Sequence, residues 1–258
     1  ATFPGGKGAN QAVAAARLGA HVSLIGRVGK DAFGDQLLAS AQGDGIDITH
    51  VGRDETEATG VAMIAVDERG QNSIAVASGA NFCLTADHVR EAWAELDDVD
   101  LLVMPLETPL ETIETAVSLA NESGATVVLN PAPARPLPAE LLAGIDVLVP
   151  NEPETAQLTA LPINTEAESR DAARELLALG VGNVVLTLGS RGALVLEGKM
   201  EEFTLVPARQ VEVVDTTAAG DAFVAGLAVA LGEGKSLVDA ARFANAVGAL
   251  AVTKQGAQ

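Results

Sequence analysis

Residues 100–130, DLLVMPLETPLETIETAVSLANESGATVVLN, contain a complete strand–helix–strand pattern. The apolar runs at 100–104 and 126–130 predict buried strands, and the segment 109–120 between them predicts a helix. A helical crossover of this length joins two parallel strands, and such crossovers are right-handed. The stretch therefore predicts a parallel sheet that carries helices on its faces.

The same alternation extends to both sides of this unit. A helix over 85–96 precedes it, and a strand over 146–150, helices over 153–158 and 166–179, and a strand over 183–188 follow. Closer to the N-terminus the pattern predicts a helix over 11–18, a strand over 21–28, a helix over 32–41 and a strand over 46–51. Beyond residue 194 it predicts short β segments and then helices over 222–231 and 237–252. We therefore predict a single α/β domain over 1–258, with a central, mostly parallel sheet and helices on both faces.

One segment, 60–78, interrupts this alternation. Its two β-rich runs, 61–66 and 73–77, flank the turn sequence DERG at 67–70, which predicts a β-hairpin. The hairpin is either a decoration at the sheet edge or a flap that closes over a small ligand with apolar residues such as Ile64 and Val76. We expect it to contribute to a small β lid.

Polar residues follow the predicted strands. Glu107, Asn130, Asn151 and Thr187 each lie at or just beyond the carboxyl end of a strand, where parallel α/β sheets bind their ligands. Each also has a structural explanation, because Asn130 precedes a proline, Asn151 can cap a helix, and the glycines after Thr187 can form a tight turn. Their coincidence on one edge of the sheet indicates a ligand site.

The run DTTAAGD at 215–221 is a second indication of a site. Its small residues let the backbone approach a ligand, and the N–H groups of the helix that follows attract anions, above all phosphate. Asp221 then lies beside the anion, where a carboxylate can take a proton from a hydroxyl that attacks a phosphoryl group. The alternative is that Asp215 and Asp221 only stabilise a helix start.

A second glycine-rich helix start, GGKGAN at 5–10, matches neither the Walker pattern nor the dinucleotide fingerprint.

Composition narrows the class of partner. The 35 acidic residues against 16 basic ones give a net charge of −19, which disfavours nucleic acid and anionic membrane surfaces. Cys83 is the single cysteine, and the three histidines are scattered, so neither a disulfide framework nor a zinc cluster is expected. Without a transmembrane-length run or a signal-peptide pattern, we predict a cytoplasmic protein.

The chain starts without Met at a glycine-rich loop and ends abruptly, so we expect an N-terminal segment and a C-terminal element to be missing.

Taken together, four motifs resemble the ribokinase family of sugar kinases, also named PfkB after the minor phosphofructokinase. GGKGANQA at 5–12 and DTTAAGD at 215–221 are similar to its two signatures, and NPAPAR at 130–135 and TLGSRG at 187–192 add to the resemblance. The resemblance implies ATP-dependent phosphorylation of D-ribose at O5, giving D-ribose 5-phosphate and ADP. The alternatives are a kinase for another pentose, for deoxyribose or for a nucleoside, and a non-catalytic protein that binds sugar or nucleotide.

The resemblance also implies roles for individual residues. Asp221 corresponds to the catalytic base, and the N–H groups of Ala218, Ala219 and Gly220 correspond to the anion hole. The implied sugar contacts are Gly6, Lys7, Gly8, Ala9, Asn10, Glu107 and Asp221. The implied ATP site consists of Asn151, Thr187, Leu188, Gly189, Ser190, Arg191, Gly192, Gly220 and Asn245.

Two cations and a dimer are implied in the same way. Glu154, three residues after Asn151, matches an Asn-x-x-Glu element associated with Mg²⁺ and phosphate. The residues that resemble a monovalent-cation site, expected to take K⁺, are Asp215, Thr217, Ala251, Lys254 and Gly256. In relatives the lid hairpins of two subunits pack together, which implies a homodimer. The signature here has Ala218 where Gly is commoner in the family, and we expect this change to be tolerated.

Overall fold

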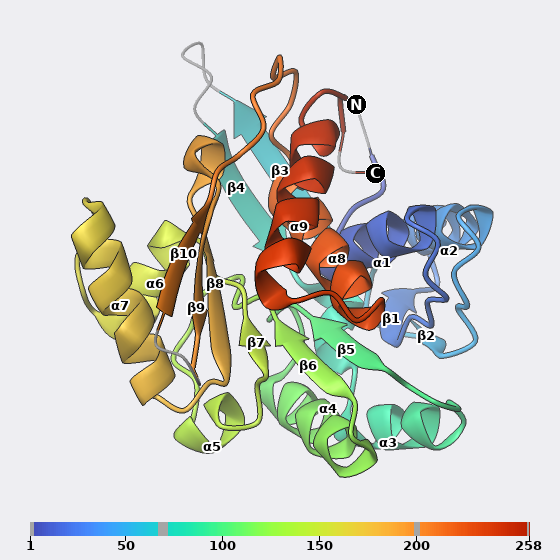
Figure 1. The fold of residues 1–258 in the computed structure, drawn as a ribbon. Helices are drawn as coiled ribbons and strands as arrows, with labels where there is room; N and C mark the ends of the chain where they lie inside the picture. The colour runs from blue at the N-terminus through green and yellow to red at the C-terminus, as the bar shows by residue number, and fades with distance from the viewer. Residues whose placement is uncertain (1–2, 67–71, 199–201, 257) are drawn as a thin grey trace.

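The structure is a computed structural model that describes residues 3–66, 72–198, 202–256 and 258. Within these residues the larger sheet has six strands in the order β10–β9–β8–β7–β6–β5 (Figure 1). Strands β5 to β8 are parallel, while β9 and β10 are each antiparallel to the neighbour before them in the chain. Their bounds are β5 Leu101–Met104, β6 Thr126–Leu129, β7 Val147–Leu148, β8 Asn183–Thr187, β9 Ala193–Glu197 and β10 Glu202–Val206. The predicted α/β class with a mostly parallel sheet is confirmed.

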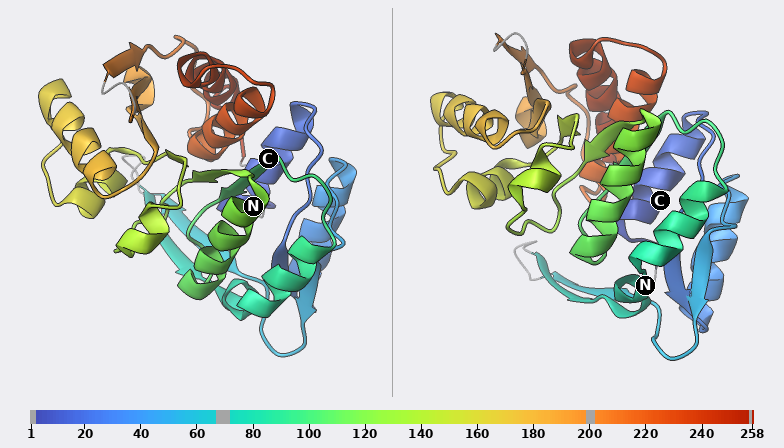
Figure 2. Two further views of the ribbon diagram at one scale, coloured as in Figure 1. Left: turned by 60° about the horizontal axis from the view of Figure 1, so that its bottom comes forward. Right: turned by 90° about the horizontal axis from the view of Figure 1, so that it is seen from below.

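Helices cover both faces of this sheet, because its central strands are apolar on both sides. Val127 and Leu129 pack on one face, together with α4 (Leu110–Ser123) and α7 (Glu166–Ala178). Val128 packs on the other face, against α8 (Ala219–Gly232) and α9 (Leu237–Ala251). The two helical layers are visible in Figures 1 and 2. This arrangement leaves the carboxyl ends of β6, β7 and β8 next to the start of α8.

Most predicted helices are present with ends shifted by only a few residues, because local caps set their limits. Thr85 and His88 form a capping box at the start of one helix, and Gly124 ends another in the left-handed conformation. The other helices are α1 Lys7–Arg17, α2 Ala32–Gly43, α3 Ala86–Ala94, α5 Ala139–Leu142 and α6 Glu152–Thr159. The short α5 was not predicted, since four residues carry no periodic pattern. No helix in the described ranges is both long and apolar enough to cross a membrane.

The first two strands begin later and are shorter than predicted. The β-pairing in this part of the chain consists of β1 (Gly26–Gly29), β2 (Val51–Asp54) and an isolated Ser23–Asp47 bridge. The β1–β2 pair is a separate parallel sheet. Ile46 is apolar because it packs against α1 and α2, and the Asp47 carboxylate accepts hydrogen bonds from Thr49 that turn the chain. Helix packing and a side-chain turn therefore produced a pattern that resembles a strand.

The predicted hairpin is confirmed as β3 (Val61–Val66) paired antiparallel with β4 (Asn72–Ala77). It is a separate two-stranded sheet, and Figure 2 shows it standing apart from the helical layers. The predicted turn at 67–70 and the side chain of Ile64 lie outside what the structure describes. Met63 and Val76 are largely exposed, and both line the wide cleft that also contains Gly6 and Glu107. The hairpin therefore borders the same cleft as Gly6 and Glu107.

Candidate active site

The two glycine-rich helix starts meet in space. α1 begins after Gly6, whose φ of 104° favours glycine, and α8 begins after Ala218. The two helices pack against each other, and the Asn10 amide Nδ2 donates to Oδ2 of Asp221 at 2.9 Å. Gln11 Nε2 donates to the other carboxylate oxygen of Asp221 at 3.3 Å. Asp221 is only 5% exposed, so its carboxylate is held between the helices by amide donors.

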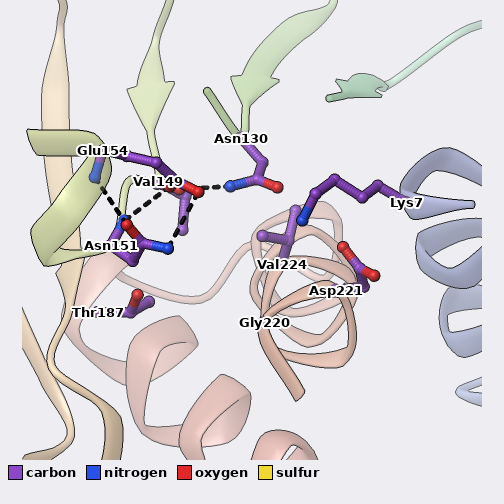
Figure 3. A pocket seen from close by; sticks show the side chains of 9 residues that line it. All are labelled: Lys7, Asn130, Val149, Asn151, Glu154, Thr187, Gly220, Asp221 and Val224. Carbon is purple, nitrogen blue, oxygen red and sulfur yellow. Dashed lines mark hydrogen bonds between the residues drawn. The ribbon is translucent and has the colours of Figure 1, made fainter. Parts of the chain in front are cut away.

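A small cavity of about 60 Å³ lies beside this contact (Figure 3). Asn130, Asn151 and Thr187 enter it from the carboxyl ends of β6, β7 and β8, as the strand-end rule predicts. Asp221 and Gly220 enter from the first turn of α8. The full lining is Lys7, Asn130, Val149, Asn151, Glu154, Thr187, Gly220, Asp221 and Val224. Residues that follow three separate strands are thus brought together around one space.

A second, much wider cleft adjoins the small cavity. It is lined by all six residues predicted to contact sugar besides Asp221, namely Gly6, Lys7, Gly8, Ala9, Asn10 and Glu107, and by the β3–β4 hairpin. Lys7 and Asp221 line both the cleft and the small cavity. Their side chains therefore lie where a ligand in the cleft would meet a ligand in the small cavity.

The start of α8 has the features of an anion site. Ala218 is the N-cap of this helix, and its methyl side chain cannot accept a hydrogen bond. The N–H groups of the first turn therefore have no side-chain partner at the N-cap. Ala219 N–H is partly used, in a long 3.3 Å bond to the Thr216 carbonyl. A Cβ placed on Gly220 would meet no atom within 4 Å, and Gly220 lines the small cavity. Nothing in the fold requires a glycine there, so its missing side chain leaves room for a ligand beside the positive end of the helix.

Two buried carboxyl groups, Asp221 and Glu154, line the small cavity, and the half-buried Glu107 lines the wide cleft. Burial raises the pKa of Asp221, Glu107 and Glu154, and the nearby Lys7 ammonium opposes each rise. The carboxylate of Glu107 also accepts a 2.8 Å hydrogen bond from the Lys7 backbone N–H. Figure 3 shows the Lys7 side chain reaching into the small cavity beside Asp221. The cavity thus combines a raised-pKa carboxyl group with a cation and a helix start.

Asn151 and Glu154 form the capping box of α6, so the structural explanation for Asn151 is confirmed. Glu154 N–H donates to Asn151 Oδ1, and Asn151 N–H donates to Glu154 Oε2, each at 2.8 Å. Asn151 Nδ2 donates to Glu154 Oε1 at 3.0 Å. Over the described residues no group of three or more His, Cys, Asp or Glu side chains gathers to hold a metal. Both oxygens of Glu154 already accept hydrogen bonds from Asn151, so this carboxylate fits an ion that is held through water.

The other residues predicted for the nucleotide lie outside the small cavity. Gly189–Arg191 form a 3-10 turn after β8, and Leu188 is buried. Gly192 has φ 103°, and a Cβ there would lie 2.0 Å from the Val206 carbonyl oxygen, so it is required for packing. Asn245 is also buried, and its Nδ2 donates to the Val206 carbonyl at 2.9 Å. It lies behind the 206–207 segment, which it supports.

The residues predicted to bind a monovalent cation are close together near the start of α8. Asp215 accepts hydrogen bonds from the N–H groups of Thr217 at 2.9 Å and Gly256 at 3.0 Å. Hydrogen bonds from Thr217 and then Gly256 hold the pKa of Asp215 below its usual value. Lys254 N–H donates to the Ala251 carbonyl at 3.2 Å. The Asp215 carboxylate is therefore ionised, and the two hydrogen bonds that it accepts leave further lone pairs free to bind a cation.

Two features of the site were not predicted from the sequence. Lys7 was predicted only as a sugar contact, and it lines the wide cleft, but its side chain also reaches the cavity that Asn151 and Thr187 line. Gln11 was not selected as a site residue, although its amide contacts both Asp221 and Asn130. The one available signal was a large polar residue that directly precedes the apolar residues Ala12 and Val13 in α1, all of them buried.

A helix-start anion site next to a buried carboxylate, at the carboxyl ends of a parallel sheet, defines a phosphotransferase site in an α/β protein. Comparison with known proteins agrees: residues 1–258 match the pfkB family carbohydrate kinase domain. The chain belongs to this family, and it is an ATP-dependent carbohydrate kinase. The family resemblance predicted from the four motifs is confirmed.

The chain is similar to proteins with defined substrates. It is 44% identical over 254 residues to the ribokinase of Haemophilus influenzae, covering 98% of this chain and 82% of that protein. It is 38% identical over 255 residues to the deoxyribokinase of Salmonella typhi, covering 98% and 83%. The solved structure of Arabidopsis thaliana ribokinase complexed with ribose and ATP superposes with a TM-score of 0.90 at 34% identity, covering 99% and 83%.

Proposed function

We propose that this chain transfers the γ-phosphoryl group of ATP to O5 of D-ribose, giving D-ribose 5-phosphate and ADP. The observation that carries the proposal is the position of Asp221, which lines both the wide cleft and the small cavity. An acceptor hydroxyl in the cleft and a phosphate at the start of α8 would meet at its carboxylate. The similarity to ribokinases supports ribose as the acceptor.

In the proposed reaction the ionised carboxylate of Asp221 takes the proton from the attacking hydroxyl. The oxygen's electron pair forms the new bond to phosphorus while the bond between phosphorus and the β–γ bridging oxygen breaks, and ADP leaves with that electron pair. General-base catalysis of this kind supplies roughly 10²- to 10⁴-fold. Because burial raises the pKa of Asp221, the carboxylate is a stronger base than an exposed Asp.

The start of α8 and Lys7 provide positive charge for the transferring group. We propose that the N–H groups of Ala218, Ala219 and Gly220 bind the phosphoryl oxygens, and that the Lys7 ammonium approaches them from α1. Fixed donors aimed at developing charge require no reorganisation during the reaction. The remaining sugar contacts are Gly6, Gly8, Ala9, Asn10 and Glu107, and the nucleotide contacts are Asn151, Thr187, Leu188, Gly189, Ser190, Arg191, Gly192 and Asn245.

Two cations assist this chemistry in the proposal. Mg²⁺ would neutralise charge on the phosphates, and Glu154 would hold it through water, since Asn151 already donates to both carboxylate oxygens. K⁺ would be held by the Asp215 carboxylate together with Thr217, Ala251, Lys254 and Gly256. This second ion would add positive charge beside the anion site without taking part in proton transfer.

The β3–β4 hairpin is proposed as a lid and as a dimer contact. It spans 60–78 of a single domain that runs over 1–258, and it lines the wide cleft. Its large apolar side chains Met63 and Val76 are 68% and 64% exposed, a pattern typical of a surface that another protein covers. We expect two hairpins to pack together in a homodimer, and light scattering of the parent and of Met63→Glu would test this.

The test of function is ADP release from Mg-ATP in potassium buffer with ribose, deoxyribose, fructose or adenosine as acceptor. We expect the highest kcat/KM with ribose. A higher value with deoxyribose would replace ribose by the alternative that the 38% identity to a deoxyribokinase favours. No ADP release with any acceptor, from a folded protein that binds ATP, would overturn the proposed reaction.

A further inference from the structure

Gln11 makes a contact that the proposed chemistry has not used. It lies on α1 next to Asn10, it is 3% exposed, and its Nε2 is 3.3 Å from Oδ1 of Asp221. Asn10 Nδ2 binds the other oxygen, Oδ2, at 2.9 Å. Each carboxylate oxygen of Asp221 therefore has its own amide donor from α1. Two donors on two oxygens fix the rotation of the carboxylate about its Cβ–Cγ bond.

The orientation of the Gln11 amide is set from the central sheet. The Val149 carbonyl can only accept a hydrogen bond, and Asn130 Nδ2 donates to it at 2.9 Å. Asn130 must then direct Oδ1 away from that carbonyl, and Gln11 Nε2 donates to this oxygen at 3.4 Å. Because Nε2 faces two acceptors, reversing the Gln11 amide would place an oxygen against the oxygens of Asn130 and Asp221. The sheet thereby determines which atom Gln11 presents to Asp221.

Gln11 carries a polar atom that packing alone does not explain. Its Oε1 is buried without a hydrogen-bond partner in the described structure. A buried unpaired carbonyl oxygen costs free energy, and an apolar side chain of similar length would avoid that cost. A residue needed only to fill space between α1 and the sheet would not require an amide here. The hydrogen bonds that Nε2 donates to Asp221 and Asn130 explain why an amide is present.

We propose that Gln11 is a positioning residue that, anchored by Asn130, holds the carboxylate of Asp221 in the orientation that accepts the proton of the attacking hydroxyl. The proposal rests on the proposed role of Asp221 as the base. Donation to the ionised carboxylate also favours its charged form. The other charged groups that face Asp221 are Lys7, Glu107 and Glu154. They stay unchanged when Gln11 is replaced.

The test replaces Gln11 by Met in the full chain, which removes the amide and keeps the length of the side chain. We expect kcat to fall roughly 10- to 100-fold, as for other misplaced catalytic groups, with the KM values for ribose and ATP changed less than about threefold. The acid limb of kcat against pH should move to higher pH, because the carboxylate loses a donor to its ionised form. Gln42→Met, on the exposed face of α2, is the matched control and should behave like the parent.

A merely structural role for Gln11 predicts the opposite pattern, with a lower melting temperature and an acid limb that stays in place. Asn130→Ala is the second variant, in case Gln11→Met does not fold. It frees the Gln11 amide and should move the acid limb in the same direction by less. Unchanged kcat and an unchanged acid limb in a folded variant would overturn the proposal.

The Asp221→Asn variant distinguishes a failure of the proposed base, Asp221, from a failure of the proposed positioning residue, Gln11. If it keeps the parental rate, the base assignment fails, whatever Gln11 does. If it loses turnover while Gln11→Met matches the parent, only the positioning role fails.

Discussion

The side-chain amide of Asn10 donates to the carboxylate of Asp221 across 2.9 Å, although 211 residues of chain separate the two. This hydrogen bond joins the first turn of α1 to the first turn of α8. The N-terminal glycine-rich segment and the C-terminal anion site therefore form a single functional unit. The behaviour of Asp221 is the most direct way to examine it.

Replacing Asp221 by Asn should lower kcat by at least about 10², because an amide cannot accept the hydroxyl proton. Binding of ATP should be largely retained, since the helix start and the strand-end residues are unchanged. ADP release and calorimetric titration with ATP measure the two effects. Asp171→Asn, at an exposed position of α7, is the control. Equal rates in parent and Asp221→Asn would remove Asp221 from its role.

Gly220→Ala should separate function from stability. A Cβ at Gly220 meets no protein atom, and alanine favours a helix over glycine, so thermal stability should stay the same or rise by about 0.5–1 kcal/mol. The methyl group would occupy space at the anion site, and we expect kcat/KM for ATP to fall about tenfold or more. Gly43→Ala, in a helix and equally free of contacts, should gain stability without losing activity. Full activity in Gly220→Ala would show that no ligand comes close to this position.

Ala218 adopts φ 58° and ψ 9°, a left-handed conformation that a Cβ disfavours. Ala218→Gly should therefore stabilise the protein by about 1 kcal/mol and change activity less than about twofold. Ala160→Gly, at φ 56° after α6, should also stabilise the fold. Ala219→Gly lies within α8 and should destabilise it by about 0.5–1 kcal/mol. Chemical denaturation of the three variants measures this, and destabilisation by Ala218→Gly would contradict the left-handed conformation.

The buried carboxyl groups predict how stability depends on pH. A carboxyl group whose pKa is raised on folding keeps its proton where the unfolded chain has lost it, so stability falls as pH rises through that window. For Asp221 and Glu154 the window starts near their usual values of 3.8 and 4.5 and extends upward. Within this window, acidification should raise the melting temperature through these two groups. Asp31 and Asp215 act in the opposite sense, because their pKa values are lowered in the folded protein. At pH values below the window they become protonated and no longer stabilise the fold, so the melting temperature should fall.

The Asp221→Asn variant is the control for how the melting temperature depends on pH. Asp221→Asn removes one raised pKa, so its melting temperature should rise less than that of the parent when the solution is acidified from neutral pH. Parallel curves for the parent and Asp221→Asn between pH 7 and pH 4 would contradict the raised pKa of Asp221.

The cation site predicts a dependence on the kind of salt. ADP release should be faster in potassium than in sodium at the same ionic strength, because the larger ion suits a set of oxygen ligands around Asp215. Asp215→Asn should reduce this preference, because it removes the ionised ligand, while ATP binding stays largely intact. Equal rates of the parent in both salts would argue against the site.

The sequence by itself determined the sheet, most of the helices and the family. The βα alternation is encoded in short windows, as the apolar runs at 101–104 and 126–129 show, and local caps such as Thr85 set the helix limits. Asp221 and Asn151 were also identifiable, because a helix start and a strand end are local features. The strand predicted over 46–51 begins later because Ile46 is apolar for helix packing, which a short window does not distinguish from pairing in a sheet.

The tertiary structure decided which of these residues work together. Only the packing of α1 on α8 places Lys7 in the cavity of Asn151, and only the position of β6 brings Asn130 to Gln11, which is 119 residues away in the chain. It also brings the Asn245 amide to the Val206 and Pro207 carbonyls, to which it donates hydrogen bonds. Side-chain contacts between such distant residues depend on how helices pack on the sheet, and local periodicity carries no information about that distance or direction.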